Sequence, residues 1–453
     1  MKRRKRQNTV LDWRSEEAQQ SARRGISRRK FVQSSASVVA AGALLGKRAF
    51  AASGPLKIGY VSPETGMLAP FGEADAFVID GIRKIVQDGI QTGGTTRQVR
   101  ILVRDSQSST NRGAEITSSL IKADKVDMVL VAGTADTVNP VANQCEINQV
   151  PCVSTDAPWQ AVYFGRGGTH DKGFDWTYHF FWGTETISLV MADIFEGIPT
   201  NKVVGMLLAN DAEGNLFSDP VKGCPPVFEA RGFKVDDPGR FPMNTTDFSA
   251  QISWFKKANA EILYGSNTLP IFSAFWGQAV QQGYRPKIVG MNKALLMPSA
   301  VNSLGRRGKN LSTEVWWTPN HPFESSLTGE TPGLLCGAYE AVTKRQWIQA
   351  LGFRHALFEI AMDVFRRAQN PESAASVIEA VRATRLDTIV GPIAWQGPPP
   401  NEWTQLPVKN VCTTPLVGGQ WVVGKKWPYE VAITANQNYP LIPVQRKMEP
   451  LPV

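Results

Sequence analysis

The sequence predicts an α/β protein with two doubly wound parallel-sheet lobes. Continuous apolar runs of strand length alternate with segments of helical periodicity, a pattern typical of parallel strands covered by helices on both faces. This alternation occurs as two separate series along the chain. Outside an N-terminal leader the chain has about 400 residues, which is too many for one hydrophobic core and suits two lobes.

The first series runs from residue 56 to residue 154. Its first strand ends at the Ser62-Pro63 turn, and alternating apolar residues form a second strand that ends at Asp105. Either Ser109 or Thr110 can cap the next helix. The expected strands are 56–61, 99–103, 126–131 and 151–154, and the expected helices are 71–88, 110–123 and 137–148.

The second series runs from residue 203 to residue 290. It is separated from the first by a Gly- and aromatic-rich stretch at 165–183 that lacks clean periodicity, and we expect a crossover or cleft-lining loop there. Gly232 closes its first helix. The expected strands are 203–208, 233–235, 261–265 and 287–290, and the expected helices are 216–231, 248–259 and 270–282.

The remaining segments can return to either sheet. After residues 314–318 the pattern is helical over 333–369 and 372–384, followed by short strands at 391–395 and 406–411. Gly418-Gly419 predicts a hairpin before Trp421. The Pro-rich tail, 428–453, is expected to run extended over the surface.

The first 51 residues have the three parts of an export signal. Arg28-Arg29 is a twin-arginine pair, a weakly apolar run follows at 38–45, and Ala49-Phe50-Ala51 offers small residues for a signal peptidase. The apolar run is too short to span a bilayer. These features predict export to the periplasm by the twin-arginine route.

The charge of +9 belongs to this leader. Residues 1–51 hold 13 of the 49 basic residues and 3 of the 40 acidic ones, which leaves 36 and 37 and a net charge of −1. A near-neutral mature chain removes the electrostatic case for binding nucleic acid or a membrane surface. No later stretch approaches the roughly 20 apolar residues of a transmembrane helix.

Motifs for cofactor, metal and nucleophile chemistry are absent. No dinucleotide fingerprint, P-loop, H-E-x-x-H, G-x-S-x-G or C-x-x-C pattern occurs, and the four histidines are not paired at ligand spacing. The adjacent His170 and Asp171 are best interpreted as solvated loop residues. The five cysteines include an odd thiol, and no disulfide is predicted, although Cys145 and Cys152 are near each other in sequence. We therefore expect neither an enzyme nor a cofactor or metal.

The mature chain resembles the periplasmic substrate-binding proteins of branched-chain amino acid-type ABC transporters, which are type I periplasmic binding proteins. Each motif is short, but their shared order and spacing extend over nearly the whole mature chain. The matching elements are Lys57-Ile58-Gly59, Ser62-Pro63, Thr65-Gly66, Phe71-Gly72, Ala132-Gly133-Thr134, Thr137, Pro140, Val150-Pro151, Ser154-Thr155-Asp156-Ala157, Thr246-Asp247-Phe248-Ser249, Lys256-Lys257, Tyr264-Gly265, Val390-Gly391-Pro392-Ile393 and Trp395.

The resemblance implies two lobes joined by three crossovers, which close by a hinge on a ligand in the cleft between them. It also implies that a monomer delivers a small polar ligand, such as an amino acid, an amide or an organic acid, to an inner-membrane permease. The implied ranges are a signal peptide at 1–51, the N-terminal lobe at 52–182 and 319–390, and the C-terminal lobe at 183–318 and 391–453. A ligand-sensing module that reports to a receptor and an exported cofactor enzyme are the alternatives.

The family holds the polar head of its ligand with loops that follow N-lobe strands, here Thr134-Ala135-Asp136-Thr137 and Ser154-Thr155-Asp156-Ala157. Hydroxyl groups and free backbone N–H groups at helix starts are suited to bind carboxylate or amide oxygens. Asp156 and Thr137 are equally explained as helix caps. Phe71 is either an aromatic wall or a buried residue at a helix start. Trp159 is the preferred aromatic candidate because it follows the second loop.

The matching C-lobe loops contain Asp211 and Glu213, Asn267 and Thr268, and Asn292 and Lys293. This chain departs from amino acid binders here, since Asn292-Lys293 stands where an acid would pair with a substrate ammonium. Lysine suits a carboxylate and Asp136 suits an amine or several hydroxyls, although Lys293 can also be a solvated rim charge. The departure makes leucine-type ligands doubtful.

Overall fold

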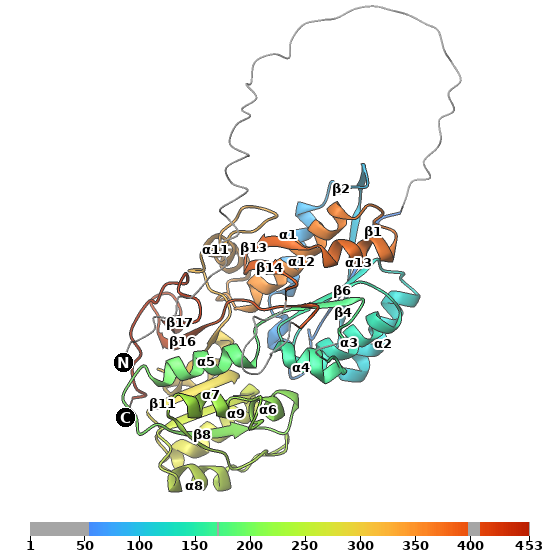
Figure 1. Cartoon of the computed structure of the whole chain (residues 1–453). Coiled ribbons are helices and arrows are strands. Elements are labelled where there is room, and N and C mark those ends of the chain that lie inside the picture. The colour runs from blue at the N-terminus through green and yellow to red at the C-terminus, as the bar shows by residue number, and fades with distance from the viewer. Residues whose placement is uncertain (1–53, 170–171, 397–407, 453) are drawn as a thin grey trace, which may run out of the picture. The chain divides into compact units, whose positions relative to one another are not determined.

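The computed structural model describes residues 54–169, 172–396 and 408–452. The predicted signal peptide and the His170–Asp171 pair therefore lie outside the described residues. The described chain forms two α/β lobes, each built on its own sheet (Figure 1). The predicted fold class is confirmed.

The N-terminal lobe is built on a sheet of six parallel strands in the order β15-β7-β6-β5-β1-β4. These strands are β1 (Leu56–Ser62), β4 (Val99–Asp105), β5 (Met128–Ala132), β6 (Cys152–Thr155), β7 (Thr177–Phe180) and β15 (Val411–Cys412). All five residues of β5 are buried, as are all four of β6, which is the burial expected for strands covered on both faces.

Helices cover both faces of this sheet (Figure 1). Side chains of α2 and α3 pack on one face, and side chains of α1, α12 and α13 pack on the other. The helices of this lobe are α1 (Asp75–Ile85), α2 (Thr110–Lys122), α3 (Ala135–Ile147), α4 (Trp159–Tyr163), α11 (Pro332–Thr343), α12 (Ala350–Arg367) and α13 (Ala374–Arg382). Two hairpins accompany them, β2 (Ile90–Thr92) with β3 (Thr95–Arg97) and β13 (Arg385–Thr388) with β14 (Gly391–Ala394).

The C-terminal lobe has a seven-stranded sheet in the order β17-β16-β12-β11-β10-β8-β9. Its strands are β8 (Val203–Leu208), β9 (Lys234–Asp236), β10 (Ile262–Asn267), β11 (Ile288–Lys293), β12 (Ser312–Val315), β16 (Val417–Val423) and β17 (Tyr429–Ala435). The last two strands are antiparallel, so this sheet is mixed. Its helices are α5 (Thr184–Phe195), α6 (Ala212–Phe217), α7 (Pro225–Ala230), α8 (Ser249–Lys257), α9 (Leu269–Gln281) and α10 (Pro298–Ser303).

The chain passes between the sheets three times. The passages follow β7, β12 and β15, and they lead into α5, α11 and β16. The last passage comes later than the expected boundary at residue 391, because β15 still pairs in parallel with β7 of the first sheet.

Several predicted elements are wrong in detail. The helix expected at 216–231 is split into α6 and α7, since Pro220, Gly223 and the Pro225-Pro226 pair interrupt it. The stretch at 165–183 ends in the buried strand β7. Gly418 and Gly419 lie inside β16 at a shift of register, and no hairpin turn occurs there. The Pro-rich tail contains β17, which completes the second sheet.

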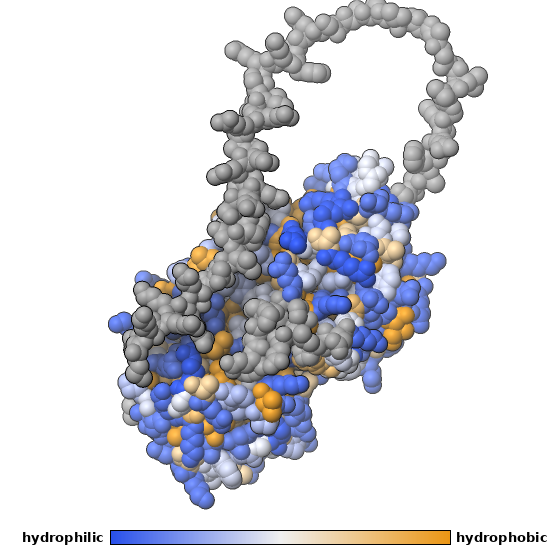
Figure 2. Space-filling view, viewed as in Figure 1, coloured by the Kyte–Doolittle hydropathy of each residue, from blue (hydrophilic) through white to orange (hydrophobic). Residues whose placement is uncertain are grey.

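The visible face of the molecule is mainly hydrophilic, with scattered apolar residues (Figure 2). Among the residues that the structure describes, no helix combines the length and apolar character needed to cross a bilayer.

Candidate functional site

A narrow cavity lies where loops after strands of both sheets meet. Ligands of open α/β sheets bind at such carboxyl ends. Its lining includes six predicted site residues, Phe71, Thr134, Asp156, Glu213, Asn292 and Lys293. The other lining residues are Pro158, Phe181, Trp182, Leu296, Glu314 and Trp316.

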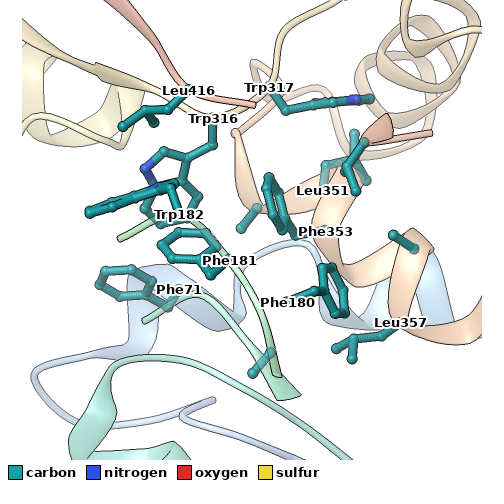
Figure 3. Packing of buried hydrophobic residues seen from close by; sticks show 14 of the residues in the cluster. Phe71, Phe180, Phe181, Trp182, Trp316, Trp317, Leu351, Phe353, Leu357 and Leu416 are labelled. Atoms are coloured by element: carbon teal, nitrogen blue, oxygen red, sulfur yellow. The ribbon is translucent and has the colours of Figure 1, made fainter. Parts of the chain in front are cut away.

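Aromatic rings form one wall of the cavity. Phe71, Phe181, Trp182 and Trp316 gather there (Figure 3). The rings of Phe71 and Trp316 have centroids 6.4 Å apart and planes inclined at 29° to each other. Trp182 and Trp316 lie in the passages that follow β7 and β12, so segments that connect the two sheets supply part of the wall. The sequence suggested an aromatic wall only at Phe71, and Phe181, Trp182 and Trp316 were not among the predicted site residues.

Asp156 belongs to a buried charge network of the N-terminal lobe. It follows β6 with a left-handed φ of 75°, a conformation that Asp tolerates better than most residues. Its Oδ2 accepts a hydrogen bond from Arg354, whose Nε donates to Asp75 at 2.9 Å and whose Nη2 donates to the Phe71 carbonyl at 2.6 Å. Helix α4 has Pro158 as its N-cap, so the interpretation of Asp156 as a cap is wrong.

Burial dominates the protonation of this network. It raises the pKa of Asp156 and of Asp75, and the Arg354 guanidinium opposes both increases. Burial alone would lower the pKa of Arg354, but the carboxylates outweigh it and raise that pKa. Asp156 lines the cavity, and its Oδ1 atom has no hydrogen-bond partner. The network therefore holds Asp156 in place and leaves one of its oxygens available to a ligand.

The other residues of the 154–157 loop serve its internal structure. Ser154 Oγ is 2.9 Å from Nδ1 of His179, whose Nε2 is 2.7 Å from the Ala157 carbonyl oxygen. Burial lowers the pKa of His179 to about 4, so this imidazole is neutral. Thr155 Oγ1 donates to the Phe180 carbonyl at 2.7 Å. These contacts position Asp156.

Lys293 is the cation of the C-terminal half of the cavity. It ends β11 with a φ of 59°. Its Nζ is 2.9 Å from Asp211 and 3.2 Å from Glu213, and its side chain is only 10% exposed. Burial alone would lower its pKa, but Glu213 and Asp211 outweigh burial and raise it. The interpretation of Lys293 as a solvated rim charge is therefore wrong.

Glu314 is a lining acid that sequence reasoning missed. It lies in β12, and Thr313 Oγ1 donates to its Oε2 at 2.9 Å. Burial raises its pKa to about 8, so it is mainly neutral at pH 7. The sequence predicts ligand contacts in loops after strands, whereas Glu314 lies inside strand β12.

The remaining predicted residues do not line the cavity. Asp136 is exposed in the first turn of α3, while Ala135 and Thr137 are buried in that helix, whose N-cap is Thr134. Trp159 donates to Glu185 at 2.9 Å and packs on Tyr163 and Phe164. Asn267 Nδ2 donates to the Leu207 carbonyl at 2.8 Å, Thr268 precedes α9, and Asp211 caps α6 while it pairs with Lys293.

Several buried polar atoms of the lining have no partner. They are the acceptors Asp156 Oδ1 and Asn292 Oδ1, the hydroxyl of Thr134, and the indole N–H groups of Trp182 and Trp316. Buried polar groups are normally hydrogen-bonded. The set indicates a site that binds a small molecule with both donor and acceptor groups.

A larger groove, partly open to solvent, lies elsewhere. Leu189, Pro226, Val227 and Leu416 line it, so it adjoins α5, α7 and the third passage. It does not lie at the carboxyl ends of strands from both sheets. We therefore assign the site to the smaller cavity. In the described part of the chain, no group of three or more His, Cys, Asp or Glu residues could hold a metal ion.

The model of the family described as periplasmic binding protein matches residues 55–404. The chain belongs to the periplasmic binding protein family. A leucine-binding protein from Thermotoga maritima has a similar structure, with a TM-score of 0.63 and 18% identity over 84% of this chain and 99% of that one.

Two further structures are similar. A branched-chain amino acid transporter substrate-binding protein from Streptococcus pneumoniae, in complex with isoleucine, has a TM-score of 0.64 and 15% identity over 84% of this chain and 99% of its own. A solute-binding protein of an ABC transporter from R. palustris, in complex with 4-hydroxybenzoate, has a TM-score of 0.64 and 15% identity over 84% of this chain and 98% of its own. These likenesses support the fold of this periplasmic binding protein.

Proposed function

We propose that this periplasmic binding protein captures a small polar organic solute between its lobes and delivers it to the permease of an ABC importer. The observation that carries the proposal is the cavity between the lobes, whose buried donors and acceptors lack partners. The solute would satisfy these groups and hold the lobes together, which shifts the population from open to closed. Chemistry on the solute is not part of the proposal.

The proposed contacts are the lining residues of both lobes. Phe71, Thr134 and Asp156 would bind from the N-terminal lobe, and Glu213, Asn292 and Lys293 from the C-terminal lobe. The structural neighbours carry isoleucine and 4-hydroxybenzoate, which supports an amino acid or an aromatic compound as the solute class. Residues 1–51 support export through the twin-arginine route to the periplasm.

A solute screen tests the proposal. The mature chain, residues 52–453, is melted in the presence of amino acids, amides, amines and aromatic acids, because binding to the native state raises the melting temperature. A saturable rise with one class is expected, together with a smaller radius of gyration by X-ray scattering. A melting temperature and scattering profile unchanged by every class would contradict the proposed capture.

A further inference from the structure

Each half of the cavity adjoins a cluster in which one basic side chain bridges two acidic side chains. In the N-terminal lobe, Arg354 bridges Asp75 and Asp156, and in the C-terminal lobe, Lys293 bridges Asp211 and Glu213. We call these the two acid–base–acid triads. Each triad has two carboxyl groups and one cation, so each has one negative charge in excess when both carboxyl groups are ionised. Asp136, exposed near the same site, interacts electrostatically with Lys293 and Asp211 and adds a further acid.

Both cations are already engaged by the protein. The Nε, Nη1 and Nη2 atoms of Arg354 all donate to protein oxygens, and Lys293 Nζ contacts two carboxylates. A ligand carboxylate would therefore meet no unpaired cation in the cavity and two triads of its own sign. Like charges repel more strongly when they are buried than when they are in water.

The lining acceptors without a hydrogen-bond partner and the aromatic rings favour a positively charged ligand. Asp156 Oδ1 and Asn292 Oδ1 are unpartnered acceptors that can receive N–H donors from a ligand. The aromatic wall of Phe71, Phe181, Trp182 and Trp316 lines the cavity, and aromatic rings attract desolvated cations. The unpartnered indole N–H groups require in addition an acceptor on the ligand, such as a hydroxyl or a carbonyl.

We propose that the solute is an organic cation, such as an amine or a guanidinium compound, that also bears a hydrogen-bond acceptor. This inference rests on the proposed function and names the solute class of the same cavity. Closure without a ligand would bring two negatively charged triads together, so a cation that offsets both favours the closed state. A negatively charged ligand would oppose closure.

Three probes of the same size separate charge from shape. They are 4-hydroxybenzylamine, 4-hydroxybenzyl alcohol and 4-hydroxybenzoate, which share a ring and a hydroxyl group and differ in charge. Titration calorimetry on residues 52–453 is expected to give at least tenfold tighter binding of the amine than of the alcohol, and no binding of the benzoate. Ethanolamine extends the cation set to a ligand without a ring that still bears a hydroxyl acceptor.

Matched variants test whether the triads cause the preference. Asp156→Asn and Glu213→Gln each remove the excess charge of one triad with little change of shape, and each is expected to weaken amine binding at least tenfold. Asp80→Asn is the control, because Asp80 is an exposed residue of α1 outside the cavity. A single cooperative urea transition at each variant would establish that it folds, even where its midpoint is lower than that of the wild type.

The outcomes distinguish the two proposals. Tighter binding of 4-hydroxybenzoate than of the amine, or no binding by any cation, would overturn the cation inference. Solute capture would still stand if an anion or a neutral compound raised the melting temperature. If no solute of any charge did so, the proposed function would fail as well.

Discussion

Removal of the buried Arg354 guanidinium tests the charge network of the N-terminal lobe directly. Arg354→Met keeps the length and apolar stem of the side chain but leaves Asp75 and Asp156 fully buried without their cation. Loss of one partner of a buried ion pair costs about 3–5 kcal/mol. The variant also loses the hydrogen bond from Arg354 to the Phe71 carbonyl, and leaving a buried acceptor without a partner costs about 1–3 kcal/mol, which is of the same order. We expect a fall of this size in the free energy of unfolding at pH 7.

The loss has a defined pH dependence. Burial raises the folded-state pKa of Asp75 and Asp156 above the ordinary value of 3.8, so stability falls as the pH rises through the folded-state values. Arg354 lowers both pKa values, so without it this fall extends to higher pH. The difference between wild type and variant is therefore larger at pH 8 than at pH 5.

Urea denaturation at pH 5, 7 and 8 measures the effect. Arg112→Met is the control, because Arg112 is an exposed partner of Glu115 in α2, and such pairs contribute about 0.3–0.5 kcal/mol. The triple variant with Asp75→Asn and Asp156→Asn should recover much of the loss. A cost below about 1 kcal/mol, or one that is independent of pH, would refute the charge network as described.

Three further predictions follow from particular residues. Glu314 binds its proton more tightly in the folded state, so the wild type loses stability as the pH rises from 4.5 to about 8, and Glu314→Gln should not. The free energy of unfolding of the variant relative to wild type, measured with urea, should therefore be higher at pH 8 than at pH 5. The same difference at both pH values would contradict this. Gly352→Ala should cost about 1–3 kcal/mol because its Cβ would lie 2.5 Å from the Trp317 ring, while Gly337→Ala, with nothing within 4 Å, should gain about 0.5–1 kcal/mol; the two urea midpoints test the contrast. Trp159→Phe should leave solute affinity unchanged by calorimetry and Trp316→Phe should weaken it, because Trp316 lines the cavity and Trp159 does not. The reverse result would contradict the assignment of the site.

The fold could be predicted because its signals are local. Apolar runs that end in turn residues located β1, β5, β8 and β10 within a few residues. The errors occurred where tertiary contacts override local patterns. Gly418 and Gly419 pack in β16 against Ile194 and Val315, so a pair of glycines that favours a turn lies inside a strand.

The site could be predicted only in part for the same reason. Asp156, Glu213 and Lys293 follow strand ends, which sequence patterns locate. Arg354 lies 198 residues from Asp156 in a helix with no distinguishing motif, and only the packing of α12 on the first sheet brings them together. The aromatic residues Trp182 and Trp316 lie in segments without periodicity, so their common wall was not predictable.

A crystal structure of residues 52–453 with the solute that most raises the melting temperature would show where the solute binds. We expect the solute between Phe71 and Trp316, within hydrogen-bond distance of Asp156, and the two lobes closed around it. A solute bound instead in the groove beside Leu189, Val227 and Leu416 would contradict the assignment of the site.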